Sequence, residues 1–220
     1  MSDRKTAAIA NILVRYFSVK PKNILVVGCG SGIEAAILAQ SFGARVVGID
    51  IVDNFHAAAK SAVTLQVADA TAMPFSDREF DFVYSYHALE HIPDYKKALG
   101  EMRRVLKPLG GWCVGTPNRA RLVGYLGSKD ATLREKFLWN AADWKMRVRG
   151  QFRNECGAHA GYTAEELSMV LEAAFGRTVD ITADYYNEIY PRHNRVLSLL
   201  RKLRVAPFLL PSVYFAGIVA

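Results

Sequence analysis

The stretch Asn23-Ile-Leu-Val-Val-Gly-Cys-Gly-Ser-Gly32 decides the fold of this chain. Its first six residues form a short run rich in branched apolar side chains, which predicts a buried strand of a parallel sheet. Glycines follow at alternate positions, Gly28, Gly30 and Gly32, and they allow a sharp turn and the close approach of a ligand. Residues 33–42 have helical periodicity. The motif is therefore a strand, a glycine loop and a helix.

The remaining sequence alternates short apolar runs with helical segments. Further strands are predicted at 45–50, 63–67, 80–86, 112–116, 178–186 and 213–219. Helices are predicted at 5–17, 54–61, 94–106, 163–175 and about 194–204. Asp53 is the expected N-cap of the helix over 54–61, and Thr163 with Glu166 predicts a capping box. Strands joined by helices through short loops predict an open parallel sheet with helices on both faces.

The composition is that of a globular protein. The chain has 220 residues, of which 51% are hydrophobic and 22% are charged, so a single domain with a substantial core is expected. Its three cysteines, Cys29, Cys113 and Cys156, are widely spaced. This spacing rules out a disulfide framework, matches no metal-ligand pattern and favours a reducing compartment.

Neither end of the chain predicts a signal peptide or a membrane span. The charged start Met1-Ser-Asp-Arg-Lys5 argues against a signal peptide. The stretch 205–220 has sixteen uncharged residues and is interrupted by Pro207 and Pro211, whereas a spanning helix needs about 20 apolar residues. We therefore expect a cytoplasmic protein in which 205–220 forms a buried strand with its lead-in.

The positive charge is concentrated in one segment. The net charge is +7, and residues 119–153 hold nine basic and three acidic residues, a balance of +6. Such a segment is either a solvated helical face or a surface that attracts an anion. The anion would be a phosphate, a carboxylate, an anionic lipid headgroup or a nucleic acid.

Asp50 indicates the ligand class. It ends the strand after the glycine loop, 18 residues beyond Gly32, where a carboxylate can accept hydrogen bonds from both hydroxyls of a ribose. A dinucleotide fingerprint needs glycine at position 33, which is Ile33, and a pyrophosphate would meet Glu34 in the first helical turn. A sulfonium ligand with an amino group tolerates an acidic neighbour. The charges therefore favour S-adenosylmethionine over NAD.

A longer pattern carries a family resemblance. Residues 24–118 contain, almost continuously, the stretches ILVVGCGSG, VVGID, VADATAMPFSDREFDFVYSYHALEHIPD, EMRRVLKPLGG and TPN. In order and spacing they resemble the class I S-adenosylmethionine-dependent methyltransferases, in the type 11 group that is similar to ubiquinone and menaquinone biosynthesis methyltransferases. The sequence departs from the family at Leu109, where glycine is usual, and the type of that turn stays open.

The resemblance implies an α/β fold with a Rossmann-like, seven-stranded, mostly parallel sheet, helices on both faces and an antiparallel last strand. It implies a single methyltransferase domain over 1–220. Within it, 1–20 would be an N-terminal helical cap, and 119–162 a basic helical insertion after the fifth strand. In the family such an insertion often covers the acceptor, so we expect a substrate lid.

The resemblance also implies a cofactor site. The glycine loop would line the methionine part and the ribose, and Asp50 would accept the ribose hydroxyls, with Ile51 against the adenine. Asp69 would accept a hydrogen bond from the adenine amino group. The residues expected to bind S-adenosylmethionine, or the product S-adenosylhomocysteine, are Gly28, Cys29, Gly30, Gly32, Asp50, Ile51, Asp69, Ala70, Met73 and Tyr86.

His87 and His91 are the candidate catalytic bases, because both follow the fourth strand on the cofactor edge of the sheet. Methyl transfer depends mainly on holding the acceptor in line, so a dedicated base is not required for every acceptor. No metal ion is expected. The candidate acceptor-binding residues are Arg147, Arg149, Arg153, His159 and Tyr162.

The expected function is S-adenosylmethionine-dependent methyl transfer to a small molecule or biosynthetic intermediate. The basic segment favours an anionic acceptor, such as a phosphorylated or lipid-linked sugar or a carboxylate. Two alternatives stay open: a module that binds S-adenosylmethionine without catalysis, and a nucleotide-dependent oxidoreductase. Nucleic acid is disfavoured, because Thr116-Pro-Asn118 does not resemble the Asn-Pro-Pro-Tyr loop used on exocyclic base amines. Peripheral membrane contact through the lid or the apolar tail stays open, and no oligomeric state is predicted.

Overall fold

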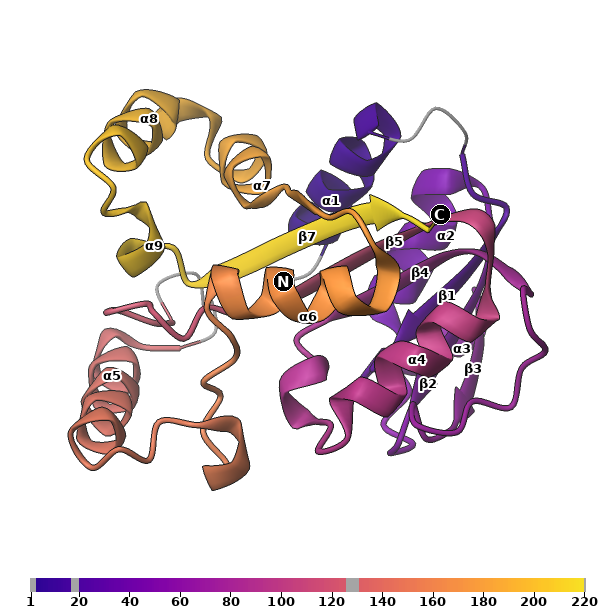
Figure 1. Cartoon of the computed structure of the whole chain (residues 1–220), viewed down its shortest axis with the longest axis horizontal. Coiled ribbons are helices and arrows are strands. Elements are labelled where there is room, and N and C mark those ends of the chain that lie inside the picture. The colour runs from indigo at the N-terminus through magenta and orange to yellow at the C-terminus, as the bar shows by residue number, and fades with distance from the viewer. Residues whose placement is uncertain (1–2, 17–19, 126–130, 220) are drawn as a thin grey trace.

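The computed structural model describes residues 3–16, 20–125 and 131–219, and its centre is a seven-stranded sheet (Figure 1). The strands are β1 (Asn23–Val27), β2 (Arg45–Asp50), β3 (Thr64–Val67), β4 (Phe80–Tyr86), β5 (Leu106–Pro117), β6 (Val179–Asp180) and β7 (Ser212–Ile218). Their order is β3-β2-β1-β4-β5-β7-β6. β7 runs antiparallel to both of its neighbours, and the other pairs are parallel. The predicted Rossmann-like sheet with a reversed last strand is confirmed.

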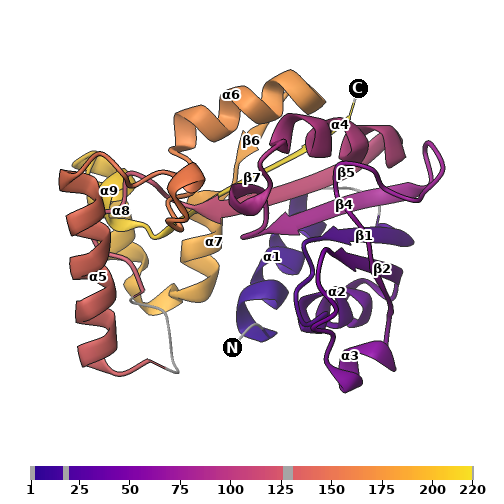
Figure 2. The same ribbon diagram turned by 90° about the horizontal axis from the view of Figure 1, so that it is seen from below.

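Helices cover both faces of the sheet (Figure 2). They are α1 (Asp3–Tyr16), α2 (Ile33–Phe42), α3 (Ala57–Lys60), α4 (Tyr95–Val105), α5 (Leu133–Val148), α6 (Ala164–Phe175), α7 (Thr182–Ile189), α8 (Asn194–Lys202) and α9 (Ala206–Leu209). α4 and α6 pack on one face, whereas α1, α2 and α7 pack on the other. In β1, Ile24 and Val26 join the core under α1 and α2, while Leu25 and Val27 join the core under α4. This strand is buried on both faces, which explains its continuous apolar run.

The pairing of β1 with its two neighbouring strands determines where the candidate site lies. β1 pairs with β2 on one side and with β4 on the other, so the strand order reverses there. In open α/β sheets, the crevice outside the carboxyl ends of the strands at such a point is where ligands bind. The glycine loop after β1 and Asp50 at the end of β2 both lie at this edge.

The predicted strand over 178–186 is mostly wrong. Only Val179–Asp180 forms a strand, β6, and the chain then enters α7. The buried side chains of α7 recur every three or four positions, which is the period of a helix: Thr182, Tyr185, Tyr186 and Ile189. Packing against α1 and β7 selects the helix for a segment whose apolar pattern fits both structures.

The predicted cap of α3 is also wrong. α3 begins at Ala57, later than expected, and the His56 ring accepts a hydrogen bond of 3.2 Å from the Ala58 amide. Asp53 instead forms an ion pair with Lys60, at 3.2 Å. The side chain nearest to the first helical turn therefore makes the cap, although an aspartate stands three residues earlier.

Other local predictions are confirmed. The Thr163 hydroxyl accepts a hydrogen bond of 3.2 Å from the Glu166 amide, and the Glu166 carboxylate accepts one of 2.8 Å from the Thr163 amide. These two bonds form the predicted capping box at the start of α6. The lead-in to β7 contains the short helix α9, and the strand itself covers most of the predicted range.

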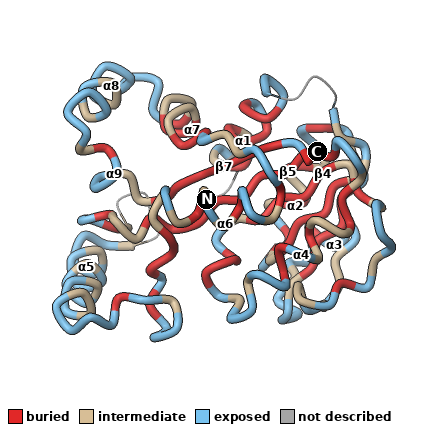
Figure 3. Tube along the Cα trace, viewed as in Figure 1, coloured by how far each residue is buried: buried red, intermediate tan, exposed pale blue. Residues whose placement is uncertain are grey.

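The predicted lid, 119–162, includes residues 126–130, which lie outside the described ranges, and its described part contains the helix α5, which projects from the sheet. α5 and α8 contain no buried residue (Figure 3). Together with α9, they lie beyond the carboxyl end of β5, on the side away from β2 and β3 (Figure 2). None of the helices in the described ranges combines the length and the apolar character that crossing a bilayer demands.

Leu109 occupies a strained position at the start of β5. Phe80 pairs with Leu106, but Phe82 pairs with Gly111, so residues 107–110 bulge out of the strand. In this bulge Leu109 has a φ of 59°, in the left-handed region that glycine adopts without a Cβ clash. Its side chain is 77% exposed, so packing does not offset the strain. The family's usual glycine would fit this backbone.

We predict that Leu109→Gly raises the free energy of unfolding by about 0.5–1 kcal/mol, because glycine removes the strain at positive φ. Urea unfolding followed by circular dichroism measures the difference. Leu109→Ala is the matched control: it removes the exposed side chain, keeps the Cβ and should leave stability unchanged. Equal stabilisation by both substitutions would contradict a backbone origin.

Candidate active site

The glycine loop ends β1 at the carboxyl edge of the sheet. Gly28 and Gly30 have φ angles of 71° and 51°. A Cβ at Gly28 would lie 2.1 Å from the Cβ of Ala88, just after β4, so a larger residue does not fit. A Cβ at Gly30 would meet no atom within 4 Å. The loop is therefore packed tightly against the segment after β4 at Gly28 and faces open space at Gly30.

Asp50 connects this loop to β2. Its Oδ2 accepts a hydrogen bond of 2.8 Å from the Gly30 amide, and its Oδ1 accepts one of 3.2 Å from the Val52 amide. A carboxylate offers about four acceptor positions, so Asp50 keeps capacity for further donors. Beside it, Ile51 and Val52 are 66% and 51% exposed. The end of β2 thus combines hydrogen-bond acceptors with an apolar surface.

The loop after β3 contributes a second acidic group. The Asp69 carboxylate accepts a hydrogen bond of 2.7 Å from the Thr71 amide, and this bond holds the pKa of Asp69 below its usual range. Met73 is buried; its amide donates to Glu101, and its carbonyl accepts from Arg104. The ion pair between Glu101 and Arg104 on α4 therefore fixes the backbone that carries Asp69.

Cys29 and Ala70 offer backbone and packing rather than reactive groups. Cys29 is buried, and its amide donates a 2.9 Å hydrogen bond to the Ile49 carbonyl. Burial, with the charge of Asp50, raises the pKa of the Cys29 thiol to about 12, so the thiol stays protonated at neutral pH. Ala70 packs at the border of the core under α4.

Glu34 and Tyr86 lie at the ends of neighbouring elements. Glu34 stands in the first turn of α2, and burial raises its pKa to about 7, against the opposing charge of Lys5. Tyr86 ends β4, and its ring stacks on Tyr214 with 5.6 Å between centroids. Burial first, and then the charge of Glu34, raise the pKa of Tyr86 to about 12. Glu34 is thus an acidic group close to the glycine loop and β4.

His87 is held firmly directly after β4. Its φ is 51°, its amide donates to the Gly115 carbonyl at 2.8 Å, and its Nε2 lies 3.1 Å from the Ser212 hydroxyl. The ring also packs on Tyr86. Part of the residue is exposed to solvent. Desolvation by the surrounding protein, and then nearby positive charges, lower the pKa of His87 to about 3. Such a weak base fits a positioning role better than proton abstraction at neutral pH.

His91 and His159 come together beside Glu90. Their rings meet edge to face with 4.6 Å between centroids, and His91 Nε2 lies 3.9 Å from Glu90 Oε1. Glu90 is buried, whereas both imidazoles are exposed. Sequence reasoning missed Glu90, for which the only signal was its position next to His91. A predicted base and a predicted acceptor-binding residue are therefore neighbours.

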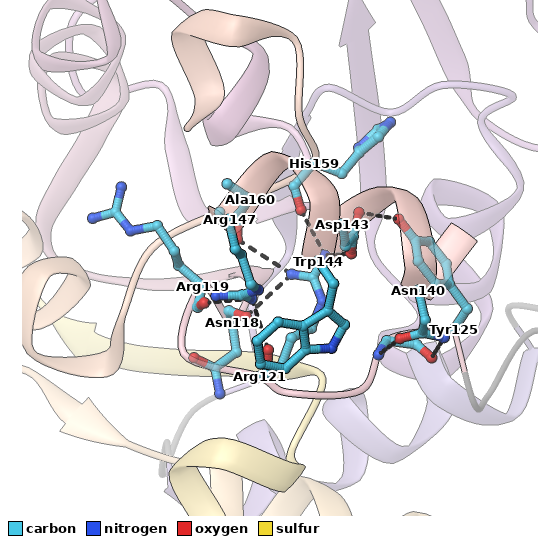
Figure 4. Close-up of polar contacts among 12 residues, drawn as sticks. Asn118, Arg119, Arg121, Tyr125, Asn140, Asp143, Trp144, Arg147, His159 and Ala160 are labelled. Carbon is cyan, nitrogen blue, oxygen red and sulfur yellow. Dashed lines mark hydrogen bonds and ion pairs between the residues drawn. The ribbon is translucent and has the colours of Figure 1, made fainter. Parts of the chain in front are cut away.

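A buried arginine, which sequence reasoning also missed, ties α5 to the segments around it (Figure 4). Arg121 is 4% exposed, and its guanidinium donates to the carbonyls of Asn118, His159 and Ala160 at 2.9–3.2 Å. It also donates to the Asp143 carboxylate of α5 at 3.2 Å. One side chain thus joins the end of β5, the segment before α6, and α5.

The predicted acceptor-binding residues differ in how free their side chains are to contact an acceptor. Arg147 donates to two backbone carbonyls of the segment after β5, at 2.9 and 2.7 Å, and its guanidinium stacks on Phe152 at 3.9 Å. This guanidinium therefore ties α5 to the segment after β5. Arg149 and Arg153 are exposed, and Tyr162 is buried against α4.

Comparison with known sequences finds a family match for the part of the chain that contains this site. Residues 25–114 match the family model described as "Methyltransferase domain". The chain is 40% identical over 108 residues to the chloroplastic tocopherol O-methyltransferase of Arabidopsis thaliana, a match that covers 43% of this chain and 31% of that protein. It is 34% identical over 108 residues to phosphoethanolamine N-methyltransferase 2 of Caenorhabditis elegans, covering 45% of this chain and 25% of that protein. The chain spans about a third or less of the length of these two relatives.

Comparison with solved structures supports the fold over nearly the whole chain. Phosphoethanolamine N-methyltransferase 2 of Haemonchus contortus, in complex with S-adenosyl-L-methionine, matches with a TM-score of 0.59 at 21% identity. The match covers 96% of this chain and 52% of that chain. At this identity the likeness shows that the two chains share a fold. The stretch that resembles the methyltransferase domain family contains the glycine loop, Asp50, Asp69 and His91.

We predict that Arg121→Met lowers the free energy of unfolding by about 3–5 kcal/mol, because the substitution leaves Asp143 without its buried partner. Urea unfolding measures the loss, and hydrogen exchange should show it first in α5. Arg149→Met is the matched control. Arg149 is exposed at the C-terminal end of α5, and its substitution should change stability by less than about 0.5 kcal/mol. Similar losses in both variants would refute the anchoring role of Arg121.

Proposed function

We propose that this protein transfers the methyl group of S-adenosylmethionine to a small-molecule acceptor at the carboxyl edge of β1, β2 and β4. The observation that carries the proposal is the Asp50 carboxylate, which binds the Gly30 amide and keeps acceptor positions beside an exposed apolar surface. Glu34, at the start of α2, disfavours a pyrophosphate there whenever its carboxyl group is ionised, because two negative charges would then meet. A cationic sulfonium ligand suits these charges better than a dinucleotide does.

The cofactor would lie across the glycine loop from β2 towards β4. Asp50 accepts the ribose hydroxyls, and Ile51 and Val52 lie against the adenine. Asp69, which its hydrogen bond keeps ionised, accepts from the adenine amino group. At the other end, Glu34 attracts the amino group of the methionine part when its carboxyl group is ionised.

The transfer itself demands mainly alignment. The sulfonium is already a good leaving group, so the acceptor has only to be held in line with the carbon–sulfur bond. His91 and His159 reach solvent on the lid side of this edge, and the acceptor would enter there. Burial lowers the pKa of His91, so its ring is neutral at pH 7 and able to take a proton from a hydroxyl acceptor.

We further propose that the acceptor carries an anionic group. Two relatives are named for small acceptors, tocopherol and phosphoethanolamine. Arg149 and Arg153 of the lid are exposed and give this side of the molecule a positive field. Arg147 contributes charge to this field, although its polar groups are bound to backbone carbonyls.

We place the protein in the cytoplasm, at the surface of an anionic membrane. The segment from 189 to the end of β7 contains no acidic residue. Around α8 it carries five exposed basic side chains, Arg192, Arg195, Arg201, Lys202 and Arg204. Exposed apolar side chains stand among them at 46–61% exposure, and these are Val196, Leu199, Leu203 and Phe208. A basic amphipathic helix of this kind lies flat among lipid headgroups.

A cavity next to this surface supports an acceptor with an apolar part. Its volume is about 660 Å³, and Arg201, Arg204, Phe208 and Leu210 form part of its wall. It extends to Asn118, at the end of β5 where the lid begins. Ligand pockets have volumes of about 300–1,000 Å³, so the cavity is large enough for a hydrocarbon chain. A membrane-bound acceptor could therefore place its tail here.

We predict that Asp50→Asn weakens the binding of S-adenosylhomocysteine by more than about 10-fold, because the amide keeps one acceptor oxygen where the carboxylate has two. The rise of the melting temperature with ligand concentration measures the affinity. Asp53→Asn, which alters an exposed carboxylate paired with Lys60, is the matched control and should bind normally. Unchanged affinity of Asp50→Asn would refute the ribose contact.

We predict that the protein sediments with vesicles containing phosphatidylserine and much less with pure phosphatidylcholine, because its basic helix faces an anionic surface. The double substitution Leu199→Glu and Leu203→Glu should reduce binding by more than about 10-fold, since it places two charges on the inserting face. Met169→Glu, at an exposed apolar residue of α6, is the control and should bind as the wild type does. Equal loss in both variants, or no binding of the wild type, would contradict a membrane role for α8.

A further inference from the structure

Glu90 is a buried carboxylate without a hydrogen-bond partner. It belongs to the short helical turn Leu89–His91, and none of its side-chain surface is exposed. Among the described residues, neither carboxylate oxygen accepts a hydrogen bond. Burying an ionised carboxylate in this way costs several kcal/mol, and buried polar groups are therefore nearly always bonded. A buried carboxylate without a partner marks a place where a bound ligand can offset the cost of burial.

Two imidazoles face this carboxylate from different parts of the chain. His91 Nε2 lies 3.9 Å from Glu90 Oε1, and one ligand atom each of Glu90, His91 and His159 lies within 4.8 Å of the others. The Arg121 network holds His159 by its carbonyl, and its imidazole points away from that network (Figure 4). The backbone of His159 is thus fixed while its ring is available.

We propose that Glu90, His91 and His159 bind a divalent transition-metal ion. Two imidazole nitrogens and one carboxylate oxygen are the donor set of many catalytic zinc and non-haem iron sites, whereas Mg²⁺ and Ca²⁺ prefer oxygen ligands. Ligand bonds of about 2.0–2.2 Å place ligand atoms about 3–4 Å apart. The separation between Glu90 and His91 is already in this range, and rotation of the exposed His159 ring closes the remainder.

The ion would keep open positions on its solvent side. Glu90 approaches from the protein interior, and both imidazoles are exposed, so three protein ligands leave room for an oxygen of the acceptor. This use of the site rests on the proposed methyl transfer. A bound hydroxyl has a lowered pKa and releases its proton to solvent, so in the metal-loaded protein His91 acts as a ligand and no longer as the base. The oxygen then forms a bond to the methyl carbon as the carbon–sulfur bond breaks, and the sulfonium becomes a neutral thioether. The site therefore favours acceptors that present a hydroxyl group.

The direct test uses Co²⁺ as a spectroscopic probe on the untagged, chelator-treated full chain. The variant Cys156→Ser serves as background, because Cys156 is an exposed thiol that could bind the probe elsewhere. We expect one ion per chain, visible absorption bands of a low-coordinate Co²⁺ site, and displacement of Co²⁺ by Zn²⁺.

The ligand variants are Glu90→Gln and His159→Ala, and each should weaken Co²⁺ binding by more than about 10-fold. His193→Ala, an exposed histidine outside the cluster, is the matched control and should bind as the background does. Circular dichroism and the affinity for S-adenosylhomocysteine are measured on every variant, and both should be unchanged.

Failure of the background protein to bind Co²⁺ stoichiometrically, or equal binding by Glu90→Gln, overturns the metal site. If the background protein does not bind S-adenosylhomocysteine, the proposed function is overturned, but the metal site is not. A hydroxyl acceptor whose methylation rate is the same in the metal-free and Zn²⁺-loaded protein overturns the role of the ion in the transfer, although its binding is confirmed.

Discussion

The hydrogen bond from the Gly30 amide to the Asp50 carboxylate is the contact on which the proposed site depends. β1 and β2 are parallel and in register from Asn23 with Arg45 to Val27 with Ile49, so the glycine loop and Asp50 reach the same edge. Asp50 uses part of its acceptor capacity to hold the loop and keeps the rest for a ligand. Because Gly28 also packs directly against Ala88, the main chain fixes the shape of the cofactor site before any ligand binds.

Two buried ionisable side chains near this edge, Arg121 and Glu90, differ in their partners. Arg121 donates to three carbonyls and the Asp143 carboxylate, so its desolvation is compensated within the chain. Glu90 has no such bonds, and burial raises its pKa to about 7. Arg121 therefore has a structural task, which is to fix α5 and the backbone of His159. Glu90 and the two imidazoles beside it form a group that is available for chemistry.

Contacts between near neighbours in the sequence could be predicted, and remote ones could not. The glycine loop, Asp50 at a strand end and the capping box at Thr163 each depend on a few adjacent residues, and the structure has all three. α7 was missed because packing against α1 and β7 selects between two periods that its sequence fits equally well. The contacts of Arg121 with Asp143 and His159, and the approach of His159 to Glu90, were missed because they join residues far apart in the sequence.

Calorimetric titration of the purified protein with S-adenosylmethionine, S-adenosylhomocysteine and NAD tests the central claim most directly. A site built on a ribose-binding carboxylate and an acidic helix start should bind both sulfur ligands with micromolar or tighter affinity, about −8 kcal/mol or better, and should not bind NAD. Binding of NAD, or the failure of both sulfur ligands to bind, would contradict the assignment of the site to methyl transfer.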